Sequence, residues 1–330
     1  MEYVFLGRTG LRVSPLAFGT MSFGGDVDET VAAAMFDRCR EAGINLFDCA
    51  DVYNQGRAEQ ILGRLVSGAR DQVVLTTKAY FPTGPGPNDR GSSRFHLRRA
   101  VEASLRRLGT EYVDLLFLHR MDDQTPLPET LREVEHLVQQ GKVLYPAVSN
   151  FAAWQTARAL GVAEHHGWAP VCCVQPMYNL LKRQAESEIL PMCEAEGLGC
   201  LTYSPLAGGL LTGKYGVEQR PSHGRIVDNR MYGVRYGAPH NFEIAERFNA
   251  LAHEHAVPPA ALAIAWVAAH PAVTAPLLGA RSLSQLEGGL AAAEIEMSDV
   301  LYEQIAALSP APAPATDRNE ETSAHNYGAR

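Results

Sequence analysis

Val113-Asp114-Leu115-Leu116-Phe117-Leu118-His119 is a short, nearly continuous apolar run that ends in a polar side chain. Two earlier runs end in the same way, since Asn45-Leu46-Phe47 leads into Asp48 and Val73-Val74-Leu75-Thr76-Thr77 leads into Lys78, with Tyr53 shortly after Asp48. Short apolar runs rich in β-branched or aromatic residues are typical of buried strands. At one end of neighbouring parallel strands, an acid, a phenol, an amine and an imidazole would converge on one site.

Strand-like and helix-like segments alternate along most of the chain. The strand candidates end near Thr20, Asp48, Lys78, His119, Val148, Gln175, Tyr203 and Leu278. The helix candidates between them span residues 28–42, 57–65, 95–108, 128–140, 152–165, 186–196 and 284–292. Pro128 suits the first turn of its helix, and Gly43, Gly109 and Gly141 suit positions past helix ends. This alternation predicts an α/β fold, a (β/α)8 TIM barrel.

Several segments lie outside the barrel pattern. Residues 3–6 and 11–14 flank a turn-rich linker and predict a short N-terminal β-hairpin. Residues 206–240 form a connection long enough to be a functional lid or a disordered segment. Helices are expected at 241–255, 258–269 and 299–308. The sequence therefore predicts one barrel domain over residues 1–308, followed by a disordered Pro/Ala-rich tail over 309–330.

Composition narrows the functional classes. The 330 residues are 46% hydrophobic and 20% charged, which is ordinary for a globular protein. The net charge of -8 and the dispersed Lys and Arg argue against a nucleic-acid partner. We find no signal-peptide pattern and no apolar run of membrane-spanning length. The six cysteines include no C-x-x-C pair, and we interpret them as small hydrophobic residues of a protein in the reducing cytoplasm.

The four polar residues suit the reduction of a carbonyl group. A tyrosine keeps its proton at neutral pH, and a nearby cation eases release of that proton in the transition state. Lys78 supplies the cation, which Asp48 would hold in its charged form, and His119 can orient the carbonyl oxygen by a hydrogen bond. Each residue also has a structural interpretation: a capping Asp48, a surface Tyr53, a solvated Lys78 and a core His119.

Five motifs resemble those of the aldo-keto reductases. Phe47-Asp48-Cys49-Ala50-Asp51-Val52-Tyr53 is similar to F-D-T-A-x-x-Y, with Glu59-Gln60-Ile61-Leu62-Gly63 similar to E-x-x-L-G, and residues 114–119 are similar to D-L-x-x-x-H. Gly141-Lys142-Val143 with Val148-Ser149-Asn150-Phe151, and Tyr203-Ser204-Pro205-Leu206 with Gly213-Lys214, resemble two further elements. The resemblance covers residues 1–308. It implies a (β/α)8 barrel, carbonyl reduction dependent on NAD(P)(H), and a proton donor, Tyr53, assisted by Asp48, Lys78 and His119.

The resemblance also implies a cofactor site across the barrel mouth, with NADPH favoured over NADH. Arg281 suits a 2′-phosphate because a guanidinium matches phosphate geometry. The N-terminus of the helix that follows Arg281 also favours an anion. Residues 208–215 nearly match a Walker A loop, but Tyr215 replaces its Ser or Thr, which excludes a nucleotide triphosphatase and leaves Lys214 to hold a pyrophosphate. The predicted cofactor residues are Gly19, Thr20, Met21, Asp48, Ser149, Asn150, Gln175, Tyr203, Ser204, Pro205, Leu206, Gly209, Lys214, Arg225, Gly279, Arg281 and Gln285.

Three positions depart from the family pattern. Gly288-Gly289 replace the usual Glu-Asn at the adenine end, Ala147 replaces a glycine, and Met21 stands where many relatives have tryptophan. Met21 would widen the substrate pocket, which Phe23, Tyr80 and Phe81 are candidates to line. Ser149-Asn150 also suits a helix N-cap, and both roles are compatible.

Two other functions compete with the predicted reductase of small aldehydes or ketones. One is a non-catalytic subunit that binds NADPH and regulates a channel, resembling the channel β-subunits of the same superfamily. The other is a metal-dependent isomerase or lyase on the same barrel, which would need carboxylate and His ligands on several strand ends. Because the strand ends offer only Asp48 and His119, with a lysine between them, we predict no metal site.

Overall fold

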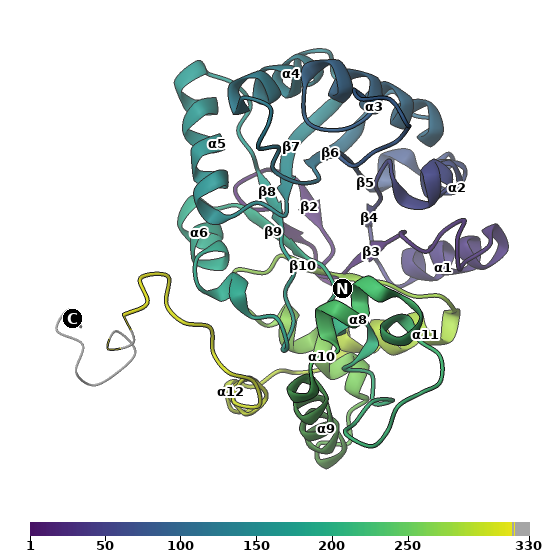
Figure 1. The fold of residues 1–330 in the computed structure, drawn as a ribbon. Helices are drawn as coiled ribbons and strands as arrows, with labels where there is room; N and C mark the ends of the chain where they lie inside the picture. Colours follow the sequence, from purple (N-terminus) through teal and green to yellow (C-terminus); the bar gives the residue numbers. More distant parts are fainter. Residues whose placement is uncertain (319, 321–330) are drawn as a thin grey trace.

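Eight parallel strands close into one barrel in a computed structural model that describes residues 1–318 and 320 of the chain (Figure 1). The strands follow one another around the barrel in the order β10-β3-β4-β5-β6-β7-β8-β9. Their bounds are β3 Ala17–Gly19, β4 Leu46–Asp48, β5 Val74–Ala79, β6 Val113–Leu118, β7 Val143–Ser149, β8 Cys173–Gln175, β9 Gly199–Thr202 and β10 Ala275–Leu278. The predicted (β/α)8 fold is confirmed.

The register of the strands brings their carboxyl ends to one face. Every residue of β5 and β6 is buried, as expected for parallel strands covered on both sides. Gly19 pairs with Asp48, and Ser149 pairs with Gln175 on the other side of the barrel. These pairs place the predicted site residues on a common rim, where (β/α)8 proteins carry their chemistry.

Six helices surround the barrel between β3 and β9 (Figure 1). They are α1 Glu29–Glu41, α2 Arg57–Val66, α3 Arg94–Leu108, α4 Leu127–Gln139, α5 Ala153–His166 and α6 Ile189–Glu196. The Asp28 side chain caps α1 by accepting a hydrogen bond from Val31 N at 2.9 Å. Gly109 ends α3 with φ 64°, a left-handed conformation that glycine adopts without strain. These helices match the predicted ranges within a few residues.

The N-terminal hairpin closes the amino end of the barrel, opposite the predicted site. Its strands are β1 Val4–Phe5 and β2 Arg12–Val13. Leu6 is fully buried in the same cluster as Leu46 and Leu115 of the barrel interior. Gly7 has φ 54°, and a Cβ there would lie 2.5 Å from the Gly197 carbonyl oxygen, so only glycine fits this approach.

The long connection after β9 is folded, so a disordered segment is the wrong interpretation of residues 206–240. It contains η4 Ala207–Gly209, α7 Arg225–Asp228 and α8 Arg230–Tyr236. Tyr232 and Tyr236 anchor α8 in the core, and Asn179 Nδ2 donates to Tyr236 Oη at 3.1 Å. The sequence did not predict α8, because so short a helix has too few apolar residues to show the hydrophobic periodicity of a helix.

Further helices complete the fold beside β10 (Figure 1). They are α9 Pro239–Glu254, α10 Pro259–Ala268, α11 Leu283–Leu290, η5 Ala291–Glu294 and α12 Asp299–Ala306; short 3-10 helices also occur at η1 Tyr53–Gly56, η2 Arg70–Gln72 and η3 Gln184–Glu186. Among the helices of the described residues, none is long and apolar enough to span a membrane.

The chain leaves the barrel after α12. Residues 309–318 form no helix or strand. The Ser309 and Ala313 carbonyls accept hydrogen bonds from Arg183 and Ser187, at 3.1 and 2.9 Å. Residue 319 and residues 321–330 of the predicted disordered tail lie outside the described residues, and the domain boundary at 308 stays a prediction.

Candidate active site

Asp48, Tyr53, Lys78 and His119 meet at the carboxyl end of the barrel. The ammonium of Lys78, at the end of β5, donates to Asp48 Oδ2, to the Cys49 carbonyl at 2.7 Å and to Tyr53 Oη at 3.3 Å. The Tyr53 and His119 rings meet edge to face with centroids 6.0 Å apart. The sequence predicted this convergence, and the geometry matches it.

Asp48 is fixed by donors from the neighbouring strand β5 and from β8 across the barrel. Its Oδ1 accepts hydrogen bonds from Thr76 Oγ1 at 2.8 Å and from Gln175 Nε2 at 2.9 Å. Its Oδ2 accepts from Lys78. A buried carboxylate is tolerated where such donors satisfy its oxygens, so Asp48 is held in one orientation beside the lysine.

A strained turn positions Tyr53. The two residues after it, Asn54 and Gln55, have φ values of 48° and 59° inside η1. Asn54 Nδ2 secures this turn by donating to the carbonyls of Met21 at 2.9 Å and Phe23 at 2.7 Å. Left-handed backbone at residues other than glycine persists only where surrounding contacts hold it, and it is common at functional sites.

Lys78 is charged and leaves the proton of Tyr53 free. Burial lowers the pKa of Lys78, but Asp48 and the phenol of Tyr53 raise it by more, so it stays above its ordinary value. An ammonium group has three hydrogens, and here Asp48, the Cys49 carbonyl and Tyr53 accept them. Because Tyr53 accepts from Lys78, its own hydroxyl hydrogen remains for another acceptor.

Tyr53 keeps that proton throughout the neutral range. Burial raises the pKa of Tyr53 to about 12, and the charge of Lys78 opposes this rise. The phenol therefore enters any reaction protonated. As the proton leaves, the ammonium 3.3 Å away stabilises the growing negative charge on the oxygen.

His119 is neutral. Burial, and to a smaller extent the charge of Lys78, together lower the pKa of His119 to about 2. Its Nδ1 is buried and has no hydrogen-bond partner among the described residues. Because His119 lines the cavity, Nε2 is the ring nitrogen available to a ligand there. The Phe81 ring packs against the imidazole with centroids 4.8 Å apart. A proton on Nε2 makes His119 a donor for a substrate oxygen.

A cavity of about 980 Å³ opens above these residues. All of the predicted site residues line it except Thr20 and Lys78. Thr20 lies beneath the cavity floor, where its fully buried hydroxyl donates to the Asp48 carbonyl at 2.9 Å. Thr20 therefore acts as a support for Asp48 in this structure, since its hydroxyl holds the Asp48 carbonyl and it does not line the cavity. Lys78 is sealed behind Tyr53 and Asp48.

One wall of the cavity carries hydrogen-bonded polar groups at the carboxyl ends of β6, β7 and β9. Tyr203 Oη donates to Asn150 Oδ1 at 2.8 Å, and Asn150 Nδ2 donates to the His119 carbonyl at 2.9 Å and to Ser149 Oγ at 3.0 Å. Gln175 donates to Asp48, but its Oε1 accepts no hydrogen bond from the part of the chain that the structure describes. The Oε1 atom of Gln175 is therefore free to accept a hydrogen bond from a ligand in the cavity.

Another part of the cavity wall carries three cations. Lys214, Arg225 and Arg281 all line it. Burial lowers the pKa of Lys214, and the charges of Arg281 and Arg225 lower it further, so the three cations are near one another. Gln285 Oε1, in the first turn of α11, accepts from the Arg281 amide at 3.0 Å and fixes the preceding loop. The arrangement suits a ligand with several negative charges.

Acidic groups are scarce in this cavity. Asp48 is the only Asp or Glu among the lining residues, and Lys78 already pairs with it. Over residues 1–318 and 320, no three His, Cys, Asp or Glu side chains are grouped so that they could hold a metal ion. Gly288 and Gly289 line the cavity too, so this stretch of wall presents backbone in place of longer side chains.

The sequence missed a set of lining residues. Of the three aromatic candidates for the pocket, Phe81 lines it and Tyr80 does not. The third candidate, Phe23, is fully buried in the core. Missed polar and apolar lining residues include Ser22, Asn54, Arg120, Met231, Tyr232, Arg235 and Ile264. Arg120 could have been found because it directly follows His119. The three residues of α8 could not, because the sequence did not place that helix.

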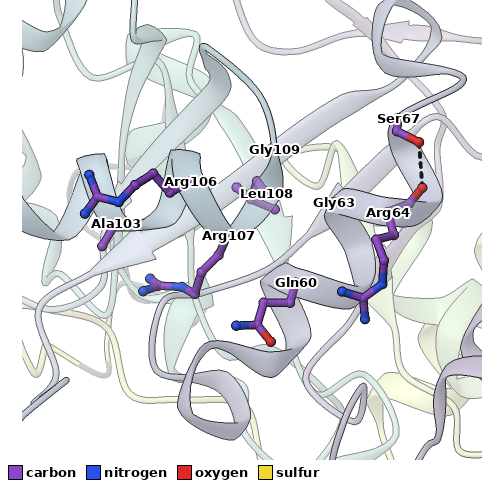
Figure 2. Close-up of a pocket in the computed structure, with 9 residues that line it drawn as sticks. All are labelled: Gln60, Gly63, Arg64, Ser67, Ala103, Arg106, Arg107, Leu108 and Gly109. Carbon is purple, nitrogen blue, oxygen red and sulfur yellow. Dashed lines mark hydrogen bonds between the residues drawn. The ribbon is translucent and has the colours of Figure 1, made fainter.

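A second hollow, of about 720 Å³, lies between α2 and α3 on the outside of the barrel (Figure 2). Arg64, Arg106 and Arg107 line it, but none of the predicted site residues does. Arg64 pairs with Glu29 at 2.6 Å, and Arg107 pairs with the buried Glu59 at 2.6 Å. These ion pairs join helices, so we interpret the hollow as a surface feature of helix packing.

The chain is similar to known proteins over nearly its whole length. The model of the Aldo/keto reductase family matches residues 15–310. The chain is 39% identical to the uncharacterized oxidoreductase YrpG of Bacillus subtilis (strain 168), over 94% of this chain and 97% of that protein. It is 37% identical to a probable voltage-gated potassium channel subunit beta of Arabidopsis thaliana, over 89% and 92%. It is 34% identical to L-glyceraldehyde 3-phosphate reductase of Escherichia coli O157:H7, over 87% and 86%.

Proposed function

The chain belongs to the aldo/keto reductase family, and from its site geometry we propose that it reduces an aldehyde or ketone to an alcohol with NADPH. Tyr53 is the proposed proton donor. The observation that carries this proposal is the hydrogen bonding of Lys78, which uses all three ammonium hydrogens and leaves the Tyr53 proton free. Two of the similar proteins have names that describe oxidoreductases, which supports a catalytic role.

In the proposed reaction, the chain orients the carbonyl and protonates its oxygen. A reduced nicotinamide supplies the hydride when it is bound. His119 Nε2 donates a hydrogen bond to the carbonyl oxygen and so favours the negative charge that develops there. Tyr53 then transfers its proton to that oxygen, and Lys78 stabilises the resulting phenolate. Asp48 keeps the lysine charged and in place.

The residues of the cavity fit such a cofactor. The free Oε1 of Gln175 suits the amide group of a nicotinamide, and the half-buried Tyr203 lines the same cavity. Lys214 and Arg225 suit a pyrophosphate. Arg281 suits a 2′-phosphate, which is why we propose NADPH in preference to NADH. All six cysteines are free thiols, and a cytoplasmic location is part of this proposal.

A second candidate function is a regulatory subunit that binds NADPH without turning over a substrate. It is favoured by the 37% identity to a probable channel subunit beta. The two functions differ in rate, because a binding subunit would oxidise bound NADPH very slowly even when aldehyde is in excess.

The deciding assay mixes purified protein and NADPH with a panel of aromatic and aliphatic aldehydes and ketones, and follows the absorbance of the reduced cofactor. We expect multiple turnovers with at least one aldehyde, and slower oxidation when NADH replaces NADPH. Tight binding of NADPH without consumption above the blank for any compound would instead support the regulatory subunit.

A further inference from the structure

Five cationic side chains, of which the proposed function uses three, line the main cavity. They are Arg120, Lys214, Arg225, Arg235 and Arg281. Asp48 is the only acid among the lining residues, and Lys78 neutralises it. The cavity therefore has a strong excess of positive charge in a chain whose net charge is -8. Such an excess concentrates anionic ligands.

Three of the five cations form one group. The charges of Arg281 and Arg225 contribute to the lowered pKa of Lys214, behind the contribution of burial. The proposed function assigns this group to the phosphates of the cofactor. Arg120 and Arg235 do not contribute to the pKa of Lys214 and have no role in that function.

Arg120 and Arg235 line the same cavity beside other residues of the proposed site. Arg120 is the next residue after His119. Burial raises the pKa of Tyr203, and the guanidinium of Arg235 opposes this rise, which places Arg235 near that ring. Tyr203 is joined to the His119 carbonyl through Asn150, by hydrogen bonds of 2.8 and 2.9 Å. Arg120 is therefore adjacent in the chain to His119, and Arg235 lies near Tyr203. Arg235 also shares the Tyr232 ring with Arg225, since the two Cζ atoms lie 5.5 and 5.3 Å from the centre of that ring.

Neither arginine has an acidic partner within residues 1–318 and 320. Arg235 contacts the Met231 sulfur at 3.8 Å, and its Cζ lies 5.5 Å from the centre of the Tyr232 ring. Arg120 makes no hydrogen bond or ion pair with the described residues. By contrast, Arg281 of the other group has Asp26 at 3.5 Å. A planar guanidinium beside a cavity, without a carboxylate, has its donors free for a carboxylate or phosphate of a ligand.

We propose that Arg120 and Arg235 form an anion subsite, and that the substrate is an aldehyde or ketone carrying a carboxylate or phosphate away from its carbonyl. This inference rests on the proposed function. The subsite adds binding energy outside the reacting atoms, and it orients the carbonyl toward Tyr53 and His119 by holding the far end of the substrate.

Matched substrate pairs test the subsite. The carboxylate pair is para-carboxybenzaldehyde and its methyl ester, and the phosphate pair is glycolaldehyde phosphate and glycolaldehyde. We expect kcat/KM to be at least about tenfold higher for the charged member of one pair, and the pair with the larger ratio identifies the anion. In Arg120→Gln and in Arg235→Gln that ratio should fall by about tenfold, because a charge-assisted hydrogen bond is lost.

Arg230→Gln is the matched control. Arg230 is exposed on the same helix as Arg235 but does not line the cavity. The ratio for this variant should equal that of the unmodified protein. A ratio near one in the unmodified protein, with both members reduced, would overturn the subsite while the reductase function stands. An unchanged ratio in both subsite variants would overturn it as well.

A binding measurement covers the case in which no compound is reduced and the reductase function fails. Benzoate and inorganic phosphate are titrated separately, by calorimetry, into protein loaded with NADP+. Binding of one anion that both subsite variants lose and Arg230→Gln keeps supports the subsite. Absence of binding to the unmodified protein, or equal binding to all variants, overturns it.

Discussion

The fully buried ammonium group of Lys78 is expected to contribute both to the stability of the fold and to the proposed proton transfer from Tyr53. In Lys78→Met, Asp48 would remain buried and lose its only cationic partner among the described residues, and the pKa of Tyr53 would rise because the opposing charge is gone. We expect a loss of about 3 to 5 kcal/mol in the free energy of unfolding and a loss of turnover of roughly 10² to 10⁴. Urea unfolding and steady-state rates measure the two effects.

The double variant Asp48→Asn with Lys78→Met separates them. It removes the unpaired charge and keeps an oxygen for Thr76 and Gln175. Stability should recover in large part, whereas turnover should stay low. Recovery of turnover together with stability would show that Lys78 matters only for the fold.

Asp51 is a buried carboxyl with no described hydrogen-bond partner for its side-chain oxygens. Burial raises the pKa of Asp51 to about 8, the nearby Glu59 raises it as well, and Arg107 and Lys78 oppose them. The folded protein therefore holds a proton that the unfolded chain releases near pH 4. The stability from this group is fully present below that pH and is lost as the pH rises toward 8.

Asp51→Asn should remove that pH dependence. Between pH 5 and pH 8, we expect the free energy of unfolding of the unmodified protein to fall by about 1 kcal/mol per pH unit more than that of the variant. Urea unfolding at several pH values measures both slopes. Parallel slopes would mean that Asp51 ionises normally in the folded state.

At the scale of elements, the turn η1 carries Tyr53 and depends on Asn54. Asn54→Gly keeps the left-handed backbone and removes two hydrogen bonds, whereas Asn54→Ala also places an alanine at φ 48°. We expect both variants to be less stable, with Ala lower than Gly by roughly 1 kcal/mol, and kcat to fall in the same order. Thermal unfolding and rates with one aldehyde would check this order, which equal stabilities of the two variants would refute.

The sequence predicted some elements of the fold and failed to predict others. The strands β5 and β6 were predictable because each is an apolar run with a polar residue at its end, and that pattern located Lys78 and His119. The helix α8 was not, since it is held by the buried Tyr232 and Tyr236 and not by a repeating apolar face. The contribution of Arg235 to the cavity depends on that helix and emerged only from the structure.

At the scale of the whole molecule, the alternation of segments sufficed to predict a (β/α)8 barrel, and the barrel in turn predicted that Asp48, Lys78 and His119 converge. Contacts across the barrel were not predictable in detail. The hydrogen bond from Gln175 to Asp48 joins β8 to β4, and the burial of Thr20 beneath the cavity depends on the register of β3 with β4. Such facts depend on strand register, which a single sequence does not specify.

We expect the two ends of the barrel to have separate tasks, and a variant at the amino end tests this expectation. Leu6 of the N-terminal hairpin is fully buried in the barrel interior, opposite the candidate active site. We expect Leu6→Ala to lower the free energy of unfolding by about 2 to 5 kcal/mol while kcat stays close to that of the unmodified protein. Thermal unfolding and kcat at a temperature where both proteins are folded provide the test, and a large fall in kcat would link the two ends.

The proton donor is the central claim for the whole molecule, and Tyr53→Phe tests it most directly. This change removes the transferable proton and leaves the ring and its contact with His119. A single-turnover measurement with NADPH and a reactive aldehyde should show cofactor binding close to that of the unmodified protein, and reduction slower by roughly 10² to 10⁴. Reduction at the unmodified rate would contradict the account, because another group would then be delivering the proton.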